Sequence, residues 1–132
     1  MQELQVKSRK REEMLDITRQ IEGLAREQGW QEGVLFLFCT HTTAALTINE
    51  AADPTVAEDI LRSLQKLVPR QGEYRHMEGN SDAHIKSSLL GCSLQVPISR
   101  GRLALGTWQG VFFAEFDGPR SRRVLVQLLA DR

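Results

Sequence analysis

The chain contains three histidines, His41, His76 and His84, and each lies in a polar segment rather than on an apolar stripe. Imidazole is the commonest metal-binding side chain in proteins, and zinc accepts it readily. Neither cysteine has a second cysteine at short spacing, so a closed zinc-finger site is not indicated. Three histidines would leave one position of a tetrahedral ion open to water or to a phosphate oxygen. The spacing fits a structural alternative equally well, in which the three imidazoles are only hydrogen-bonded or solvated.

Acidic and amide side chains lie close to the second and third histidines in the sequence. Glu78 and Asp82 are candidates for a general base, and they or Asn80 could orient an imidazole that binds a metal ion. Asp82 has a more ordinary interpretation as a capping residue. These side chains therefore extend the candidate site without proving its chemistry.

Hydroxyl groups and one cation accompany the histidines and could hold a phosphate group. They are Thr42, Thr43, Lys86, Ser87 and Ser88. Helix N-termini also attract anions, but the pattern is weak when it stands alone.

Two further segments have both a functional and a structural interpretation. Trp108 lies between glycines and could stack on a flat substrate ring, or it could pack in the core or at an interface. The basic turn at residues 118–123 could bind phosphate, although a solvated hairpin turn is the favoured interpretation.

The composition indicates one soluble domain covering residues 1–132. Apolar residues make up 41% of the chain and charged residues 26%. Seventeen basic and seventeen acidic residues cancel, so bulk charge does not favour nucleic acid or an acidic membrane. No stretch predicts a membrane span or a secretory signal, and we expect a cytoplasmic protein. Cys39 and Cys92 have apolar or small neighbours and are predicted to be buried, unpaired thiols.

Three helices are predicted from apolar spacing and from the residues that begin and end them. The first covers residues 16–29, with Asp16 as a cap and Gly29 as its exit. The second starts at Asp53-Pro54 and ends before Pro69. A loop at residues 70–80 follows, and its length suggests function. The third helix covers residues 81–91.

Strands are predicted in the remaining apolar segments. Residues 34–39 are apolar without a break, which suggests a central strand covered on both faces. Shorter strands are expected near Leu4 and Val6, after Ala44, at 93–98, at 103–116 with a break at Gly106 or Gly110, and at 123–129. Without regular strand–helix alternation, this pattern predicts an α+β domain with a mixed, mainly antiparallel sheet and two to three helices.

Several polar segments resemble the YjbQ family, which is described as secondary thiamine-phosphate synthases. The segments appear in the family's order and cover the chain from Asp16 onward; they are His41-Thr42-Thr43-Ala44, Asn49-Glu50-Ala51-Ala52-Asp53-Pro54, Tyr74-Arg75-His76, Glu78-Gly79-Asn80, Asp82-Ala83-His84, Gly106-Thr107-Trp108-Gln109-Gly110 and Glu115-Phe116-Asp117-Gly118-Pro119-Arg120.

The resemblance implies a compact homotrimer and a divalent ion, with zinc as the first choice, bound by His41, His76 and His84. It also implies a transferase reaction that joins an aminopyrimidine-methyl diphosphate to a thiazole phosphate and releases pyrophosphate. An ion held by three histidines suits hydrolysis as well. Two alternatives therefore stay open: a metallohydrolase of another substrate, and a metal-dependent binding protein without turnover.

Overall fold

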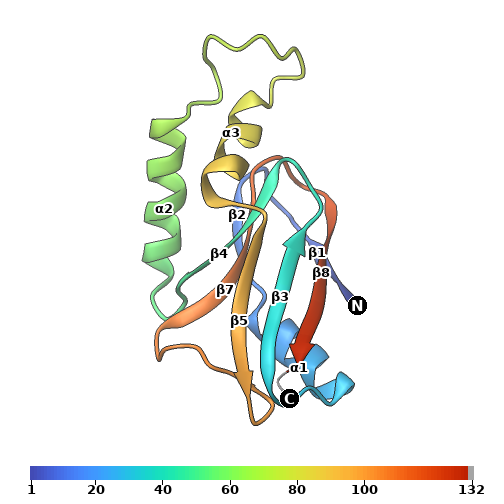
Figure 1. Ribbon diagram of the computed structural model, residues 1–132. Coiled ribbons are helices and arrows are strands. Elements are labelled where there is room, and N and C mark those ends of the chain that lie inside the picture. The colour runs from blue at the N-terminus through green and yellow to red at the C-terminus, as the bar shows by residue number, and fades with distance from the viewer. Residues whose placement is uncertain (131–132) are drawn as a thin grey trace.

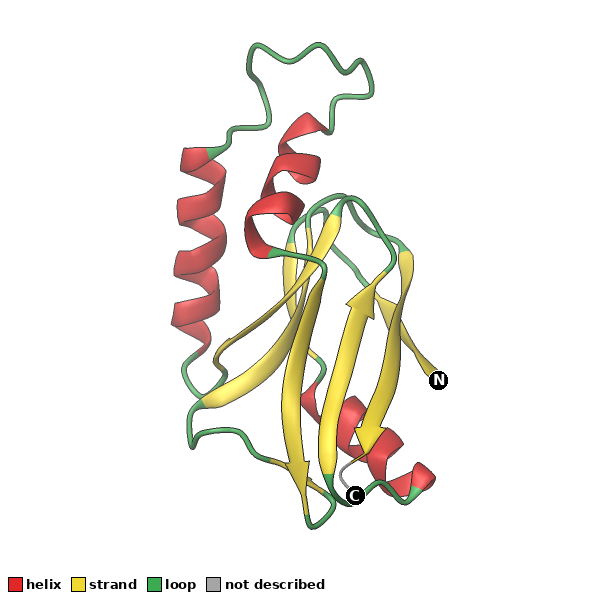
Figure 2. Cartoon of the chain, viewed as in Figure 1, coloured by secondary structure: helices red, strands yellow, loops and turns green. Residues whose placement is uncertain are grey.

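The computed structural model describes residues 1–130, which form three helices and eight strands. In chain order the elements are β1 (Gln2–Lys7), β2 (Glu13–Asp16), α1 (Thr18–Gln28), β3 (Gly33–Cys39), β4 (Ala44–Glu50), α2 (Pro54–Leu67), α3 (Ser81–Leu90), β5 (Ser93–Ser99), β6 (Arg102–Leu103), β7 (Gln109–Glu115) and β8 (Ser121–Ala130). The predicted α+β class is confirmed (Figure 2).

The strands form two sheets rather than the single sheet that was expected. The larger sheet has the order β1-β8-β3-β5-β6 and the smaller one the order β2-β7-β4. Every pair in both sheets is antiparallel. β2 was not among the predicted strands, because its four residues show no clear alternation.

A single apolar core fills the space between the two sheets. Leu35 and Leu37 of β3 face Leu46 of β4 and Phe113 of β7 in this core, and Ile21 of α1 closes it at one end. A smaller cluster on the other face of the three-stranded sheet contains Ala45, Ala114 and Phe116. Helices α2 and α3 pack there through Leu64 and Ala83, side by side in Figure 1.

The helix ends follow the local signals in the sequence. The Asp53 side chain caps α2 by accepting from the Thr55 N–H at 3.0 Å, and Pro54 takes the first helical position. Gly29 ends α1 at a φ of 67°, a left-handed conformation that glycine adopts without strain. Asp16 lies one residue before the N-cap position of α1. Its carboxylate accepts a hydrogen bond from the Thr18 N–H.

The outer face of the five-stranded sheet carries an apolar strip along β3 and part of β8. Phe36 and Phe38 point to this side of β3 with stacked rings, and Phe38 is 36% exposed. Leu125 and Leu129 lie opposite β3 on β8, and Leu129 is 54% exposed. The prediction that residues 34–39 are covered on both faces is therefore wrong for one chain. Alternate residues of this apolar run face the core and the open side of the sheet.

The cysteine prediction is confirmed in part. Both thiols are unpaired, and Cys39 is buried. Cys92 is exposed, because it follows Gly91 at the exit of α3 and lies beyond the last paired residue of β5. Helices within residues 1–130 are all too short or too polar to cross a membrane.

Candidate functional site

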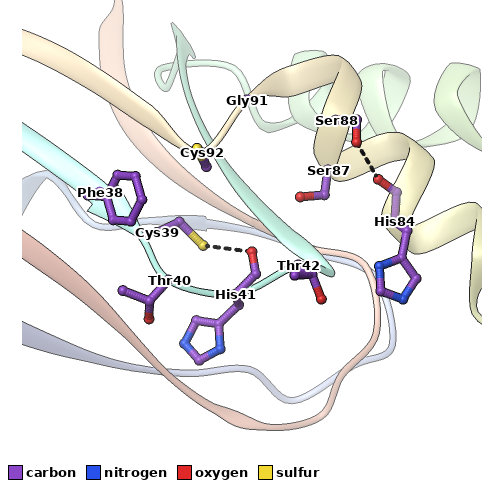
Figure 3. Close-up of a pocket in the computed structure, with 10 residues that line it drawn as sticks. All are labelled: Phe38, Cys39, Thr40, His41, Thr42, His84, Ser87, Ser88, Gly91 and Cys92. Carbon is purple, nitrogen blue, oxygen red and sulfur yellow. Dashed lines mark hydrogen bonds between the residues drawn. The ribbon is translucent and has the colours of Figure 1, made fainter.

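A groove of about 730 Å³ opens where β3 ends and α3 packs against the sheets. Figure 3 shows the residues that line it: Phe38, Cys39, Thr40, His41, Thr42, His84, Ser87, Ser88, Gly91 and Cys92. A second, more polar hollow of about 310 Å³ shares His41 and His84 with the groove and adds Glu78, Asn80, Asp117, Arg120 and Arg122. Most of the predicted site residues therefore lie in one region.

His41 lies in the bend between β3 and β4. Its Nε2 atom accepts a hydrogen bond from the Arg123 backbone N–H at 3.0 Å, so the neutral ring carries its proton on Nδ1. Partial burial and the positive charge of Arg122 lower the pKa of His41 below its ordinary value. The imidazole is consequently neutral at physiological pH, which is the form that binds metal ions.

His84 projects from the first turns of α3, and His76 reaches it from the preceding loop. The two ring centroids are 5.4 Å apart and the ring planes are perpendicular. The Nε2 atom of His76 lies 3.8 Å from a carboxylate oxygen of Glu78. His84 thus contacts His76 on one side and shares the groove with His41 on the other.

The three histidines do not converge on one point in this conformation. Residues 1–130 contain no group of three histidine, cysteine or acidic side chains within range of a common ion. His41 could contribute Nε2 only by giving up its bond to Arg123. The donor chemistry of three imidazoles nevertheless suits zinc, and a site formed by His41, His76 and His84 stays a prediction.

The predicted hydroxyl groups lie along the groove and the hollow. Ser87 is buried and donates to the Ala44 carbonyl at 2.7 Å, while Ser88 donates to the His84 carbonyl at 2.9 Å. Thr43 is also buried, and its hydroxyl accepts from Arg122 at 2.8 Å. Thr42 is exposed at the mouth. Thr42 is therefore the hydroxyl with the most freedom to contact a ligand.

Arg122 is the main site residue that the sequence interpretation missed. It is 4% exposed and forms an ion pair with the fully buried Glu115. The turn at 118–123 is therefore solvated only in part, at Arg120 and Arg123. Burial would raise the pKa of Glu115, but hydrogen bonds from Arg122 and Ser8 outweigh it and hold the pKa below its ordinary value. A signal was present, since Arg122 shares the inward face of its strand with Val124 and Val126.

Asn80 lies at the base of the polar hollow. It is 8% exposed, and its amide nitrogen donates to the Asp117 carboxylate at 2.8 Å. Its Oδ1 atom is buried and has no hydrogen-bond partner within the described part of the chain. Buried acceptors are normally satisfied, so this oxygen is suited to receive a donor from a ligand.

Asp82 and Lys86 lie outside both hollows, although each was predicted to be functional. They occupy the buried side of α3, where Lys86 Nζ binds Asp82 at 3.0 Å and Glu12 at 2.7 Å. Arg11 completes the network through two contacts with the Asp82 carboxylate. Burial would raise the pKa of Asp82, but the bonds from Arg11 and Lys86 lower it overall. A carboxylate so held is a poor general base.

Trp108 also lies away from the histidines. It precedes β7, whose first residue pairs with Glu50 at the end of β4, whereas His41 precedes the start of β4. The indole is 63% exposed. Within one chain, Trp108 is therefore at the opposite end of the smaller sheet from His41.

The fold and the site together define a class: an α+β protein of two antiparallel sheets that carries a histidine-lined groove over buried ion pairs. A family described as UPF0047 protein YjbQ-like matches residues 2–131. The chain belongs to this family.

Individual relatives agree over nearly the whole chain. A UPF0047 protein of Methanocaldococcus jannaschii is 51% identical over 97% of this chain and 93% of its own length. UPF0047 protein YugU of Bacillus subtilis is 50% identical over 96% of each chain. The crystal structure of a YjbQ/UPF0047 family protein from Clostridium acetobutylicum superimposes with a TM-score of 0.94 at 49% identity, covering 98% of this chain and 100% of that chain. A Thermus thermophilus protein gives a TM-score of 0.92 at 48% identity, with 98% and 100% covered.

Proposed function

We propose that this protein is a metal-dependent transferase of the thiamine-phosphate synthase type. The reaction joins an aminopyrimidine-methyl diphosphate to a thiazole phosphate and releases pyrophosphate. The observation that carries the proposal is the position of His84, which lies beside His76 and shares the groove with His41. The reaction type itself rests on the family resemblance.

His41, His76 and His84 are the residues that would hold a divalent ion, with zinc as the first choice. When bound, such an ion stabilises negative charge on a departing pyrophosphate. Two changes must come before an ion can bind. His41 must break its hydrogen bond with the Arg123 N–H, and the loop that carries His76 must shift. That loop is largely exposed, so such movement meets little packing resistance.

Cationic side chains support a phosphorylated substrate in the polar hollow. Arg120 lines the polar hollow, and its side chain is 53% exposed. Its guanidinium group is held by the Asp117 carboxylate at 2.8 Å. The guanidinium group has five N–H donors, so it can bind a phosphate while it keeps that anchor. Thr42 at the mouth could add a hydroxyl, and the unpartnered Asn80 Oδ1 suits a substrate amino group.

Glu78 is the stronger candidate for a proton acceptor, because Asp82 is committed to Arg11 and Lys86. Its carboxylate lines the polar hollow next to His76. In the transferase reaction it would orient the substrate or accept a proton. In a hydrolase it would instead activate water, so product analysis must separate the two reactions.

The proposed assembly is a homotrimer that covers the outer face of the five-stranded sheet. Val34, Phe36, Phe38, Leu125 and Leu129 give this face an apolar surface, and Met1 borders a small hollow between the phenylalanines. An apolar sheet face without a cover is typical of a subunit interface. Because Phe38 also lines the groove, a neighbouring subunit would lie next to the site.

The test measures metal content and product together. Elemental analysis of the wild type should find a divalent ion, and His41→Ala, His76→Ala and His84→Ala should each reduce its content severalfold while the fold is kept. Pyrophosphate release from the two proposed substrates should fall in parallel. Gln28→Ala on α1 is a matched surface control. Full metal occupancy in all three histidine variants would overturn the metal site, and metal binding without pyrophosphate release would overturn the reaction.

A further inference from the structure

The groove contains a pair of thiols that the proposed reaction does not use. Cys39 is the last residue of β3, and Cys92 lies just before β5. Leu37 pairs with Leu94 and Phe38 with Ser93, so the next step of the same register brings Cys39 opposite Cys92. The Cys39 N–H donates to the Cys92 carbonyl at 2.7 Å, which shows that the two backbones still run side by side there.

The Cα spacing expected for this pair lies within the range that a disulfide spans. Directly opposite residues of an antiparallel pair have Cα atoms about 4.5–5.5 Å apart, and disulfides span Cα separations of about 4.4–6.8 Å. Opposite residues also project to the same face of a sheet. Both side chains border the groove, as Figure 3 shows.

We propose that Cys39 and Cys92 are a reversible redox site, at which a low-molecular-weight disulfide such as oxidised glutathione is reduced and a Cys39–Cys92 disulfide forms. The exposed Cys92 reacts first: its thiolate attacks one glutathione sulfur, the glutathione S–S bond breaks, and one glutathione thiol leaves. Cys39 then loses its proton to solvent and attacks the Cys92 sulfur, which releases the second glutathione thiol. Two protein thiols are oxidised and one disulfide is reduced to two thiols.

The different exposure of the two thiols sets the order of the steps. Cys39 is buried, so reagents in solution reach its sulfur slowly. Once Cys92 carries glutathione, however, its sulfur is a neighbouring target for Cys39. The resulting bridge would tie the end of β3 to the exit of α3, and so restrain the two walls that carry His41 and His84.

The bridge would be easy to reduce again. It would lie at the frayed end of a strand pair and next to solvent, and strained or exposed disulfides are the labile ones. Reduction would release this restraint on the two walls. The site is therefore suited to switching rather than to structural stabilisation.

The experiment uses the full chain with a chelator present, incubated with oxidised glutathione at about pH 8, near the ordinary thiol pKa. Intact mass and thiol titration after denaturation are measured. The wild type should lose two hydrogen atoms, retain no glutathione and show no free thiol, and dithiothreitol should restore both thiols. Cys39→Ser should keep one glutathione on Cys92, and Cys92→Ser should keep Cys39 free. These readouts do not depend on metal binding or on the proposed reaction.

Three results would overturn the inference. The first is a wild type that retains glutathione on Cys92 while Cys39 stays free, which would show that the thiols cannot meet. The second is a disulfide between chains, seen as a covalent dimer on a non-reducing gel. The third is a wild type that does not react at all while Cys39→Ser is glutathionylated.

Discussion

Replacing Lys86 with methionine should destabilise the protein strongly. Lys86 is 1% exposed, and its ammonium group binds the carboxylates of Asp82 and Glu12. Removing one partner of a buried ion pair costs about 3–5 kcal/mol. Arg11 still holds Asp82, and Glu12 is 10% exposed with Gln65 as a second partner, so the lower value of about 3 kcal/mol applies. For a chain of this length that corresponds to a drop in Tm of roughly 10 °C.

The measurement is urea unfolding followed by circular dichroism at one fixed protein concentration. Lys66→Met on the exposed last turn of α2 is the matched control and should change the free energy of unfolding by less than about 0.5 kcal/mol. Adding Glu12→Gln to Lys86→Met should recover part of the loss, since it removes one of the two carboxylates left without the lysine. The contrary result is a Lys86→Met variant that is as stable as Lys66→Met and loses only substrate binding. Lys86 would then be a ligand-binding residue rather than a structural one.

Further predictions concern acid stability, assembly and the tryptophan. The pKa values of His41, Asp82 and Glu115 are lowered in the fold, so the unfolded chain binds more protons than the folded chain as the pH falls. The free energy of unfolding should decline below about pH 6.5 through His41 and decline further below about pH 4 through the two carboxylates. A urea midpoint that does not change down to about pH 3 would contradict this. If the proposed homotrimer forms, Leu129→Asp on the outer sheet face should convert it to monomers in light scattering, while the similarly exposed Leu89→Asp on α3 should not. Trp108→Ala should leave metal content unchanged, unless a neighbouring chain brings the indole to the site.

Local signals predicted the helices well because they act within a few residues. Asp53-Pro54 and Gly29 fix helix ends through backbone geometry that needs no distant partner. The break in the 103–116 segment was also correctly expected, since Leu103 ends β6 and β7 begins only at Gln109. Elements whose boundaries depend on nearby residues can thus be predicted from the sequence alone.

Pairing over long distances could not be predicted in the same way. β4 and β7 join β2 in a separate sheet because their inward faces pack on the larger sheet. This arrangement depends on residues far apart in the chain, so no short segment predicts it. The same limit explains the site residues. Lys86 and Ser88 are two positions apart, yet one faces carboxylates in the interior and the other faces the groove. Their roles differ because the helix turns them toward different neighbours.

The buried side of α3 explains how the groove keeps its form. This helix buries Asp82, Lys86 and Ser87 along with Ala83, so apolar contacts alone do not set its rotation. Ion pairs and hydrogen bonds depend on direction, and a helix turned by one residue would separate Lys86 from Glu12 and Asp82 from Arg11. His84 is therefore fixed on the opposite side by groups that never touch a ligand.

The other wall is held in the same manner. Arg122 joins Glu115 to the Thr43 hydroxyl, and the next residue along the chain holds His41 through its backbone N–H. His41 and His84 are thus positioned by buried ion pairs as well as by apolar packing. The network around Lys86 and the network around Arg122 share no residue. Loosening the α3 wall should therefore leave the wall that carries His41 in place. The spacing between His41 and His84 depends on both networks.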